Sequence, residues 1–448
     1  MNKREFLKAS GGAVAGSILS RAIHGQEPAG PRENWAGNLI YSTDRLQTPG
    51  SVEEVRQVVK SCAKLRALGT RHSFNTIADS TQNQISLKRL DQMAIDEKAR
   101  TVIVGAGVTY GKVSPWLDDR GYALHNLASL PHISVAGGIA TATHGSGVQN
   151  GNLATAVSGL EMVTADGETI VLSREKDGDR FLGAVVGLGA LGVVTSVTLD
   201  LLPTFKVAQS VYEDLSLAHL KDHFDEIFSS GYSVSLFTDW QGHKATEVWI
   251  KRKLAPGDKN DWQHEFFGAR LATKKLHPIE DHAAESCTEQ QGIPGPWYER
   301  LPHFRMNFTP SSGRELQTEY FVPRERGYEA ILAVEKLRDQ ITPHLFITEL
   351  RTIAADHLWM STAYQRDSLA IHFTWKPEWP EVSKILPQIE KQLEPFEPRP
   401  HWAKLFTIPP AQLESRYARL ADFQALVKQY DPEAKFRNEF LSKNLYQS

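Results

Sequence analysis

Residues 134–147 form an unusual stretch, because every side chain in it except that of His144 is Gly, Ala, Ser, Thr, Val or Ile. Small side chains let the backbone approach another group closely, and its N–H groups and short hydroxyls can bind the oxygens of a pyrophosphate. The alternative is a tight turn packed between two elements of secondary structure. The fold must therefore bring either a ligand or a second backbone against this stretch.

Length and charge limit the class of protein. A chain of 448 residues favours two domains with substantial cores. A formal net charge of -3 argues against an extended nucleic-acid surface, because neutralising phosphates requires a local excess of Lys and Arg. No stretch approaches the roughly 20 apolar residues that a membrane span requires. We therefore expect a soluble protein with no nucleic-acid partner, no membrane span and a small-molecule ligand.

The number and spacing of the cysteines and histidines do not indicate a metal site. Only Cys62 and Cys287 occur, far apart in the sequence, so neither a disulfide framework nor a cysteine metal site is predicted. Cys62 continues the apolar stripe of a predicted helix and is expected in the core. The 16 histidines are scattered, and His132 with His144 lack the spacing of metal ligands.

The first 27 residues are interpreted as an export signal and linker. Lys3, Arg4 and Lys8 precede a weakly apolar run at residues 9–19. This resembles a bacterial twin-arginine signal, although Lys3 stands where that pattern has its first arginine. The prediction is a periplasmic or secreted protein. The alternative is a disordered basic tail on a cytoplasmic enzyme.

Helices and strands alternate in the next part of the chain. Ser51 can cap a helix that runs to about residue 63, and Glu54 can bond back to the cap. A short strand is expected at residues 64–67, a further strand at residues 101–104 and a helix at residues 110–120.

A hairpin makes the predicted sheet mixed. Asp166-Gly167 separates two apolar runs, and this dipeptide tolerates the positive φ angles of a type I′ turn. From about Val207 the composition changes to aromatic-rich strands, such as residues 233–240 and 246–250, which indicates a second domain. The predicted boundaries are residues 28–205 for the first domain, 206–405 for the second, and 406–448 for a C-terminal segment, helical at 413–430, that returns to the first.

One glycine motif is rejected as a dinucleotide site. Gly187, Gly189 and Gly192 satisfy the G-x-G-x-x-G pattern. That fingerprint requires a helix after it, so that pyrophosphate meets the helix N-terminus. Residues 193–199 are instead a β-branched run that favours a strand. We therefore do not expect Rossmann-type NAD binding.

Four motifs together carry a family resemblance. They are GTRHSFN at residues 69–75, ASLPHISVAG at 128–137, THGSG at 143–147 and ELRT at 349–352. These motifs are the most specific part of a resemblance that covers nearly the whole chain after residue 33. The chain resembles the FAD-linked oxidases of the vanillyl-alcohol oxidase superfamily, and most of all the alditol (xylitol and sorbitol) oxidases. Sugar-1,4-lactone oxidases are more distantly similar. The resemblance implies an α+β, two-domain FAD-binding fold of the PCMH type, with an antiparallel-sheet substrate domain.

The same resemblance implies site residues. His72 falls on the position that bonds covalently to the flavin, and this link would raise the flavin's reduction potential. The implied cofactor residues are His72, Ala67, Leu68, Gly69, Thr70, Arg71, Ser73, Ser129, Ser134, Gly137, Thr141, Ala142, Thr143, His144, Val194 and His401. The implied substrate residues are Ser129, Gln317, Glu349, Arg351, Thr374, Lys404, Tyr110 and Val148, with Arg351, Lys404, His372 and Glu349 as catalytic groups.

These residue types suit a polyol, which is a row of hydroxyl donors and acceptors. Glu349 and Arg351 are two apart in a predicted strand, so both side chains point to the same face. The alternative to a site role is that they form a structural surface ion pair. His372 and Thr374 repeat that spacing. Arg351 with Lys404 would favour the alkoxide of the reacting hydroxyl.

The proton acceptor stays open at this stage. His372 has the unperturbed pKa nearest neutrality, but Lys404, with its pKa lowered by Arg351, could also serve.

The expected function is oxidation of a primary hydroxyl of an alditol to the aldose, by hydride transfer to flavin N5, with O2 reduced to H2O2. The nearest alternative is a sugar-1,4-lactone oxidase or dehydrogenase. An electron acceptor larger than O2 would make the protein a dehydrogenase, and Ala128 is a candidate for lining the oxygen path. A third hypothesis is an exported binding protein that keeps the flavin fold without catalysis.

Overall fold

A computed structural model describes residues 32–255 and 257–446. The predicted export signal lies outside the described residues. Helices and strands are mixed throughout, and most sheet pairings are antiparallel, as the predicted α+β class requires. No helix in the described ranges is long and apolar enough to cross a bilayer.

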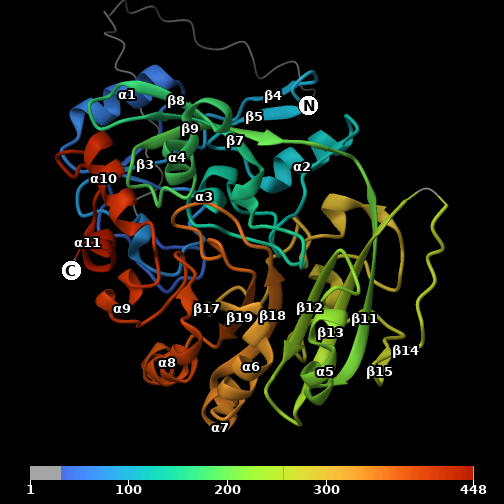
Figure 1. Cartoon of the computed structure of the whole chain (residues 1–448). Helices are drawn as coiled ribbons and strands as arrows, with labels where there is room; N and C mark the ends of the chain where they lie inside the picture. Colours follow the sequence, from blue (N-terminus) through green and yellow to red (C-terminus); the bar gives the residue numbers. More distant parts are fainter. Residues whose placement is uncertain (1–31, 256, 447–448) are drawn as a thin grey trace, which may run out of the picture. The chain divides into compact units, whose positions relative to one another are not determined.

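Two main sheets, with a further two-stranded antiparallel sheet of β6 and β10, organise the N-terminal half (Figure 1). A three-stranded parallel sheet has the order β1-β3-β2, and a five-stranded antiparallel sheet has the order β4-β5-β9-β7-β8. The strands are β1 (Leu46–Gln47), β2 (Arg66–Ala67), β3 (Gln84–Ile85), β4 (Met93–Asp96), β5 (Thr101–Gly105), β6 (Tyr122–Ala123), β7 (Val157–Val163), β8 (Thr169–Ser173), β9 (Val193–Asp200) and β10 (Leu202–Pro203). The helices are α1 (Val52–Ser61), α2 (Tyr110–Asp118), α3 (Val135–Ala140) and α4 (Arg174–Val185).

Local signals explain several of these elements. The Ser51 hydroxyl accepts a hydrogen bond from the Glu54 backbone N–H at 3.2 Å, and the Glu54 carboxylate accepts one from Gly50 N at 2.7 Å. Helix α1 ends at Ser61, earlier than expected, because Cys62 leaves the helical conformation with φ -102° and ψ 132°. Strands β7 and β8 pair as the hairpin that the sequence predicts. Gly167 has φ 80° but Asp166 does not have a positive φ, so the turn is not of type I′.

A large, ten-stranded antiparallel sheet fills the other half of the chain (Figure 1). Its order is β14-β15-β11-β13-β12-β18-β19-β17-β20, with β16 pairing β11. The strands are β11 (Lys206–Ser216), β12 (Ser233–Thr238), β13 (Lys244–Leu254), β14 (Glu265–Phe266), β15 (Ala269–Leu271), β16 (Gly295–Pro296), β17 (Leu316–Pro323), β18 (Leu345–Ile353), β19 (Ser368–Trp375) and β20 (Arg399–Pro400). The helices that follow in this half are α5 (Leu220–Phe228), α6 (Gly327–Glu335), α7 (Arg338–Ile341) and α8 (Trp379–Leu393).

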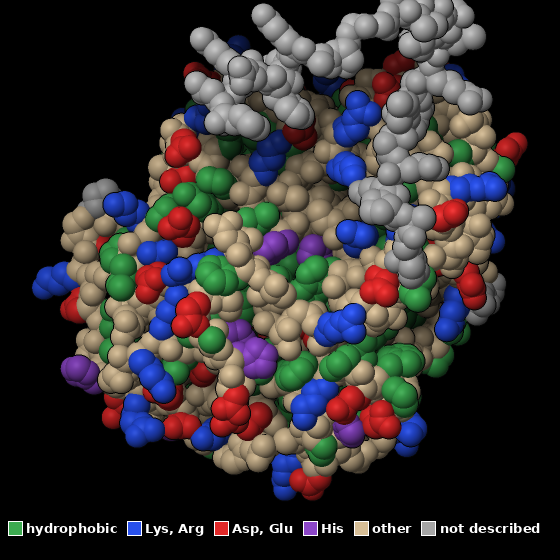
Figure 2. Space-filling view, turned by 180° about the vertical axis from the view of Figure 1, so that it is seen from behind, with side chains coloured by type: hydrophobic (Ala, Val, Ile, Leu, Met, Phe, Trp, Pro, Cys, Tyr) green, Lys and Arg blue, Asp and Glu red, His purple; other side chains and the backbone are tan. Residues whose placement is uncertain are grey.

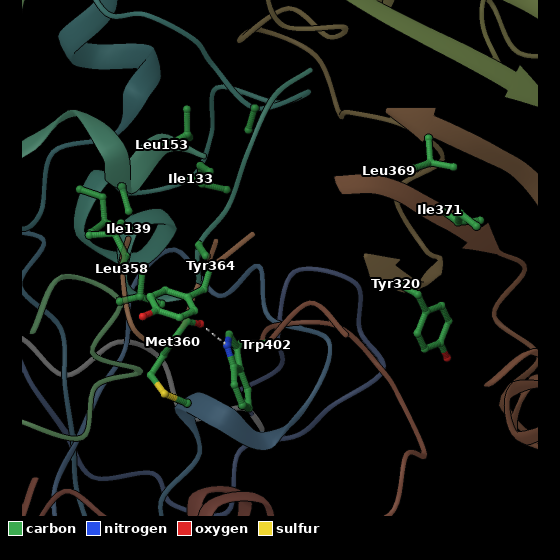
Figure 3. Close-up of a cluster of buried hydrophobic side chains, with 14 of the residues drawn as sticks. Ile133, Ile139, Leu153, Tyr320, Leu358, Met360, Tyr364, Leu369, Ile371 and Trp402 are labelled. Atoms are coloured by element: carbon green, nitrogen blue, oxygen red, sulfur yellow. Dashed lines mark hydrogen bonds between the residues drawn. The ribbon is translucent and has the colours of Figure 1, made fainter. Parts of the chain in front are cut away.

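The two faces of this sheet differ. Tyr320, Leu369 and Ile371 point to one face, where they are fully buried and where α6 and α8 pack. Figure 3 shows these side chains, and it shows the Trp402 indole donating its hydrogen bond of 2.8 Å to the Met360 carbonyl. Because side chains alternate along a strand, the residues between them point to the opposite face. That opposite face carries the polar residues of the site.

The C-terminal segment contacts the N-terminal half again. It contains α9 (Pro410–Glu414), α10 (Leu420–Tyr430) and α11 (Glu439–Leu445). The buried Arg66 guanidinium donates to the Phe436 carbonyl at 2.8 Å and to the Gly189 carbonyl at 2.7 Å. The Leu65 backbone N–H donates to the Lys435 carbonyl at 3.0 Å. The sequence stretch after β20 therefore packs against the sheet that begins at β1. The domain boundaries themselves stay predictions.

Candidate functional site

A large cavity is lined by loops of the N-terminal half and by the polar face of the large sheet. Figure 2 shows a face of the molecule on which histidine side chains gather near the centre, among hydrophobic and uncharged side chains. The predicted cofactor residues on the cavity wall are Ala67, Leu68, Gly69, Thr70, Arg71, His72, Ser73, Ser129, Ser134, Gly137, Thr141, Thr143, His144, Val194 and His401. The predicted substrate and catalytic residues on the wall are Ser129, Gln317, Glu349, Arg351, His372, Thr374 and Lys404.

Three predicted residues do not reach this wall. Tyr110 begins α2 with its side chain 2% exposed, and a Cβ on Gly138 would stand 3.4 Å from its ring, so Tyr110 packs beneath the small-residue helix α3. Ala142 is fully buried at φ 55° after that helix. Val148 is half-buried and packs against the core. The wall therefore does not include them, and their site roles stay predictions.

The histidine loop presents an unused nitrogen to the cavity. Arg71 adopts φ 66°, which turns the chain sharply before His72. The His72 ring stacks on Trp35 with centroids 5.4 Å apart, and its Nδ1 lies 3.0 Å from the Thr70 hydroxyl. Its Nε2 is buried and has no hydrogen-bond partner among the described residues. Burial lowers the pKa of His72 to about 4, so the imidazole is neutral and a nucleophile in character.

The small-residue segment forms a cradle beside that loop. The Ser134 backbone N–H donates to the Thr70 hydroxyl at 3.2 Å, which joins the two segments. A Cβ added to Gly137 would meet the Ser134 hydroxyl at 2.7 Å and nothing else nearby, so it would project into the cavity. A Cβ on Gly69 would likewise lie 2.8 Å from that hydroxyl. Backbone on both sides is thus open to a bound group.

The glycine motif that the sequence excluded from Rossmann binding also lines the cavity. Gly187, Gly189 and Gly192 all lie on its wall. Helix α4 precedes the motif and strand β9 follows it, so the reason for rejecting a Rossmann turn is confirmed. Its contribution to this cavity was missed, although its small side chains give the same signal as residues 134–147.

Three neighbouring strands align the polar side chains. In the antiparallel register, Gln317 of β17 is opposite Thr374 of β19, while Glu319 and Glu349 flank His372 on either side. Directly opposite residues share a face. The predicted common face of Glu349 and Arg351 is therefore confirmed, and the ion-pair alternative is not a surface one, because both residues are 4% exposed.

Glu319 is a residue of the site that sequence reasoning missed. Its carboxylate accepts a hydrogen bond of 2.6 Å from Arg351 Nη2 and forms a 3.0 Å ion pair with Lys404 Nζ. His144 Nε2 lies 3.1 Å from the same carboxylate. Burial raises the pKa of Glu319, but Lys404, His144 and Arg351 outweigh it and bring the pKa well below its usual range. The period-two spacing from Gln317 is the signal that could have found it.

Glu349 is the second buried carboxylate of the site. His303 Nε2 lies 2.7 Å from its Oε1, and Arg351 Nε lies 3.5 Å from its Oε2. Burial raises the pKa of Glu349, but Arg351 and His303 outweigh it and lower the pKa far below its usual range. With Glu319, it balances the charges of Arg351 and Lys404. The expected pair of cations is therefore present, but two carboxylates offset it.

His372 is left free to meet a substrate. Neither of its ring nitrogens has a hydrogen-bond partner among the described residues. Burial, followed by Lys404, lowers the pKa of His372 well below its usual range, so the ring is neutral. Arg351 Nη1 donates to the Ser129 hydroxyl at 3.1 Å, which brings Ser129 beside the same cluster. Donors, acceptors and a neutral imidazole thus converge on one part of the cavity.

Comparison with known proteins identifies the family of this chain. Residues 43–173 match the family model of an FAD binding domain, and residues 306–444 match that of D-arabinono-1,4-lactone oxidase. An alditol oxidase of Streptomyces sp. is 47% identical over 413 residues, which cover 91% of this chain and 97% of the relative. The chain belongs to the alditol oxidase family.

More distant similarities extend over nearly as much of the chain. The L-gulono-1,4-lactone dehydrogenase of Mycobacterium tuberculosis is 29% identical over 437 residues, covering 92% of this chain and 98% of the relative. The crystal structure of cholesterol oxidase from Brevibacterium sterolicum superposes with a TM-score of 0.75 at 14% identity, over 96% of this chain and 100% of that one. The predicted FAD-binding fold, which the family resemblance implied, is therefore confirmed.

The residues on the wall fit FAD. The FAD binding domain match includes the histidine loop and the open backbone at Gly69 and Gly137. Short hydroxyls of Ser134, Thr141 and Thr143 line the cavity and would supply partners for phosphate oxygens. Small side chains and unpaired polar groups at one wall are what a large, phosphate-bearing cofactor requires.

Gly137→Val tests this fit. The added side chain would enter the cavity, and it meets only a rotatable hydroxyl of the protein, so we expect a folded protein that retains less than about a tenth of the wild-type flavin. Flavin content is read from the ratio of absorbance at the flavin and protein bands, and folding from circular dichroism. Gly50→Val is the control, because Gly50 lies outside the cavity and its Cβ would meet only the mobile end of Arg89. Full flavin content in Gly137→Val would contradict the assignment of this cradle.

Proposed function

We propose that this protein oxidises a primary hydroxyl of an alditol to the aldose and transfers the two electrons through FAD to O2, so that alditol and O2 become aldose and H2O2. The observation that carries the proposal is the row of alternating donors and acceptors on three neighbouring strands, Gln317–Thr374 and Glu319–His372–Glu349, facing one cavity. A linear polyol can satisfy such a row along its length. The 47% identity to an alditol oxidase supports the same substrate class.

FAD, when bound, supplies an acceptor for the hydride that leaves the substrate carbon. The protein's own groups act on the hydroxyl. Arg351 and Lys404 stabilise the developing charge on its oxygen, since both cations lie at the cavity wall. The neutral imidazole of His372, with both nitrogens unpaired among the described residues, accepts the proton. Lys404 is the weaker candidate for that role, because its ion pair with Glu319 opposes the loss of its proton.

His72 is the proposed covalent attachment point. Its buried Nε2 has no hydrogen-bond partner among the described residues, and its ring is neutral. This nitrogen is therefore available for a covalent bond at the cavity wall. Covalent attachment would raise the reduction potential of the cofactor and prevent its loss.

We also propose that the protein is exported through a twin-arginine route. Lys3 and Arg4 before the apolar run at residues 9–19 are the basis for it.

Substrate class is tested by steady-state kinetics. We expect kcat/KM for xylitol or sorbitol to exceed that for gulono- and galactono-1,4-lactones by at least about tenfold, since one unsatisfied buried hydrogen bond costs about 1.4 kcal/mol or more. The lactones are the second candidate, because the lactone oxidase model matches residues 306–444. A clear lactone preference would replace the alditol proposal. Peroxide formed without an artificial acceptor identifies the oxidase, and its absence identifies a dehydrogenase.

Acid precipitation tests the covalent link. We expect the colour to stay with the wild-type pellet and to pass into the supernatant for His72→Ala, because that variant has no imidazole to bond the flavin. His132→Ala is the matched control, since His132 is a neighbouring histidine that lies off the cavity wall. Colour in the wild-type supernatant would show that the cofactor is not covalently held.

Glu319→Gln tests the charge arrangement. Burial lowers the pKa of both Lys404 and His372, and Glu319 opposes both shifts, so removing its charge lowers each pKa further. Activity that needs protonated Lys404 is lost as pH rises through that pKa, and activity that needs neutral His372 is lost as pH falls through its own. Both limbs of the pH profile of kcat/KM should therefore move to lower pH.

The control for that profile is Glu390→Gln, a buried carboxylate that bonds Tyr320 behind the sheet. Its profile should coincide with that of the wild type. A Glu319→Gln profile that stays in place, or moves to higher pH, would show that Glu319 does not set the charge of this site.

A further inference from the structure

A buried lysine lies beyond the cavity on the same face of the large sheet. Lys251 of β13 is 0% exposed and is not among the residues that line the cavity. We propose that Lys251 and His303 are positioning residues that hold the Glu349 carboxylate, by fixing which nitrogen of His303 carries its hydrogen. This inference rests on the proposed role of Glu349 in binding the substrate.

The Lys251 ammonium has a partner for each of its three hydrogens. They are the Leu301 carbonyl, the Pro302 carbonyl at 3.2 Å, and His303 Nδ1 at 3.1 Å. A protonated amine donates and cannot accept. Nδ1 of His303 must therefore present its lone pair to Lys251.

The hydrogen of His303 is consequently on Nε2. Burial and the charge of Lys251 lower the pKa of His303 to about 4, so the ring carries one hydrogen only. Nε2 lies 2.7 Å from Glu349 Oε1 and donates to it. The edges of Phe237 and Trp249 meet the ring at centroid distances of 5.5 and 5.0 Å, which limits its rotation.

The segment of residues 301–304 also holds Ser129 in place. The backbone N–H groups of His303 and Phe304 both donate to the Ser129 carbonyl, at 2.9 and 3.1 Å. Two residues of the cavity, Ser129 through its backbone carbonyl and Glu349 through its carboxylate, are thus held by a segment that Lys251 anchors. Lys251 reaches the substrate site only through this segment.

Kinetics of four variants test the positioning role. His303→Phe removes the donor to Glu349 and should lower kcat/KM about 10- to 100-fold, the range for a lost hydrogen bond to a charged group. His303→Gln keeps an N–H at the Nε2 position and should recover to within about fivefold of the wild type. Lys251→Met should lower kcat/KM, but the double variant with His303→Phe should lose no more than about twofold beyond His303→Phe alone, because Lys251 acts through His303.

His243→Phe is the matched control. His243 Nδ1 lies 2.8 Å from Glu335 Oε1, so the variant breaks a pair of the same chemistry away from the cavity. Its kcat/KM should equal that of the wild type. Additive losses for Lys251→Met and His303→Phe, or wild-type kcat/KM in His303→Phe, would overturn the proposal.

The tautomer is measured independently of turnover. Nitrogen-15 NMR of histidine-labelled protein, recorded below the pKa of Lys251, which burial lowers to about 7, should show His303 protonated on Nε2 in the wild type. His303→Gln identifies the signals by difference. In Lys251→Met the charge that lowers the pKa of His303 is gone, so the doubly protonated ring should appear at a higher pH than in the wild type. An Nδ1–H tautomer in the wild type, or an unchanged His303 titration in Lys251→Met, would refute the proposed relay.

The two proposals fail separately. The kinetic ratios are taken on whichever alditol or lactone the wild type oxidises fastest, so a lactone preference counts against the alditol proposal alone. The NMR result decides the tautomer even for a protein that turns over neither class.

Discussion

Burial of two cations at the site depends on Glu319. An unpaired charge cannot be taken out of water at tolerable cost, so Arg351 and Lys404 require a carboxylate within contact distance. Glu319 meets both, and its position 3.1 Å from His144 joins the large sheet to the small-residue segment. The small-residue segment and the polar face of the large sheet therefore come together at one buried carboxylate.

Successive side chains in the large sheet point to opposite faces, so one face packs against helices and the other faces the cavity. Tyr320, Leu369 and Ile371 pack against helices, and the residues between them face the cavity. The apolar face makes the strands rigid through burial, so side chains on the other face are held within hydrogen-bonding tolerance of one another. Lys251 lies on the same polar face, beyond the cavity. Because its ammonium is fully buried, it requires hydrogen-bond partners, which the backbone carbonyls and the His303 imidazole provide.

Much of the site could be predicted from the amino-acid sequence. The loop of His72, the small residues up to His144 and the ELRT strand are contiguous in sequence, so their chemistry and spacing are visible directly. Tyr110 and Val148 were carried over by resemblance, and the wall does not include them, because a position in a motif does not say which way a side chain packs. Glu319 and His303 were missed because their partners lie on other strands and on a loop distant in sequence.

The sequence by itself determined the alternation of helix and strand near the N-terminus, the hairpin at Asp166-Gly167, the rejection of a Rossmann turn and the family resemblance. These depend on local backbone preference and on short motifs. Only the tertiary structure decided that two carboxylates neutralise the cations, that the rejected glycine motif also lines the cavity, and that a buried lysine stands behind Glu349. The reason is that electrostatic balance depends on distances between side chains from different strands, which the folded chain alone sets.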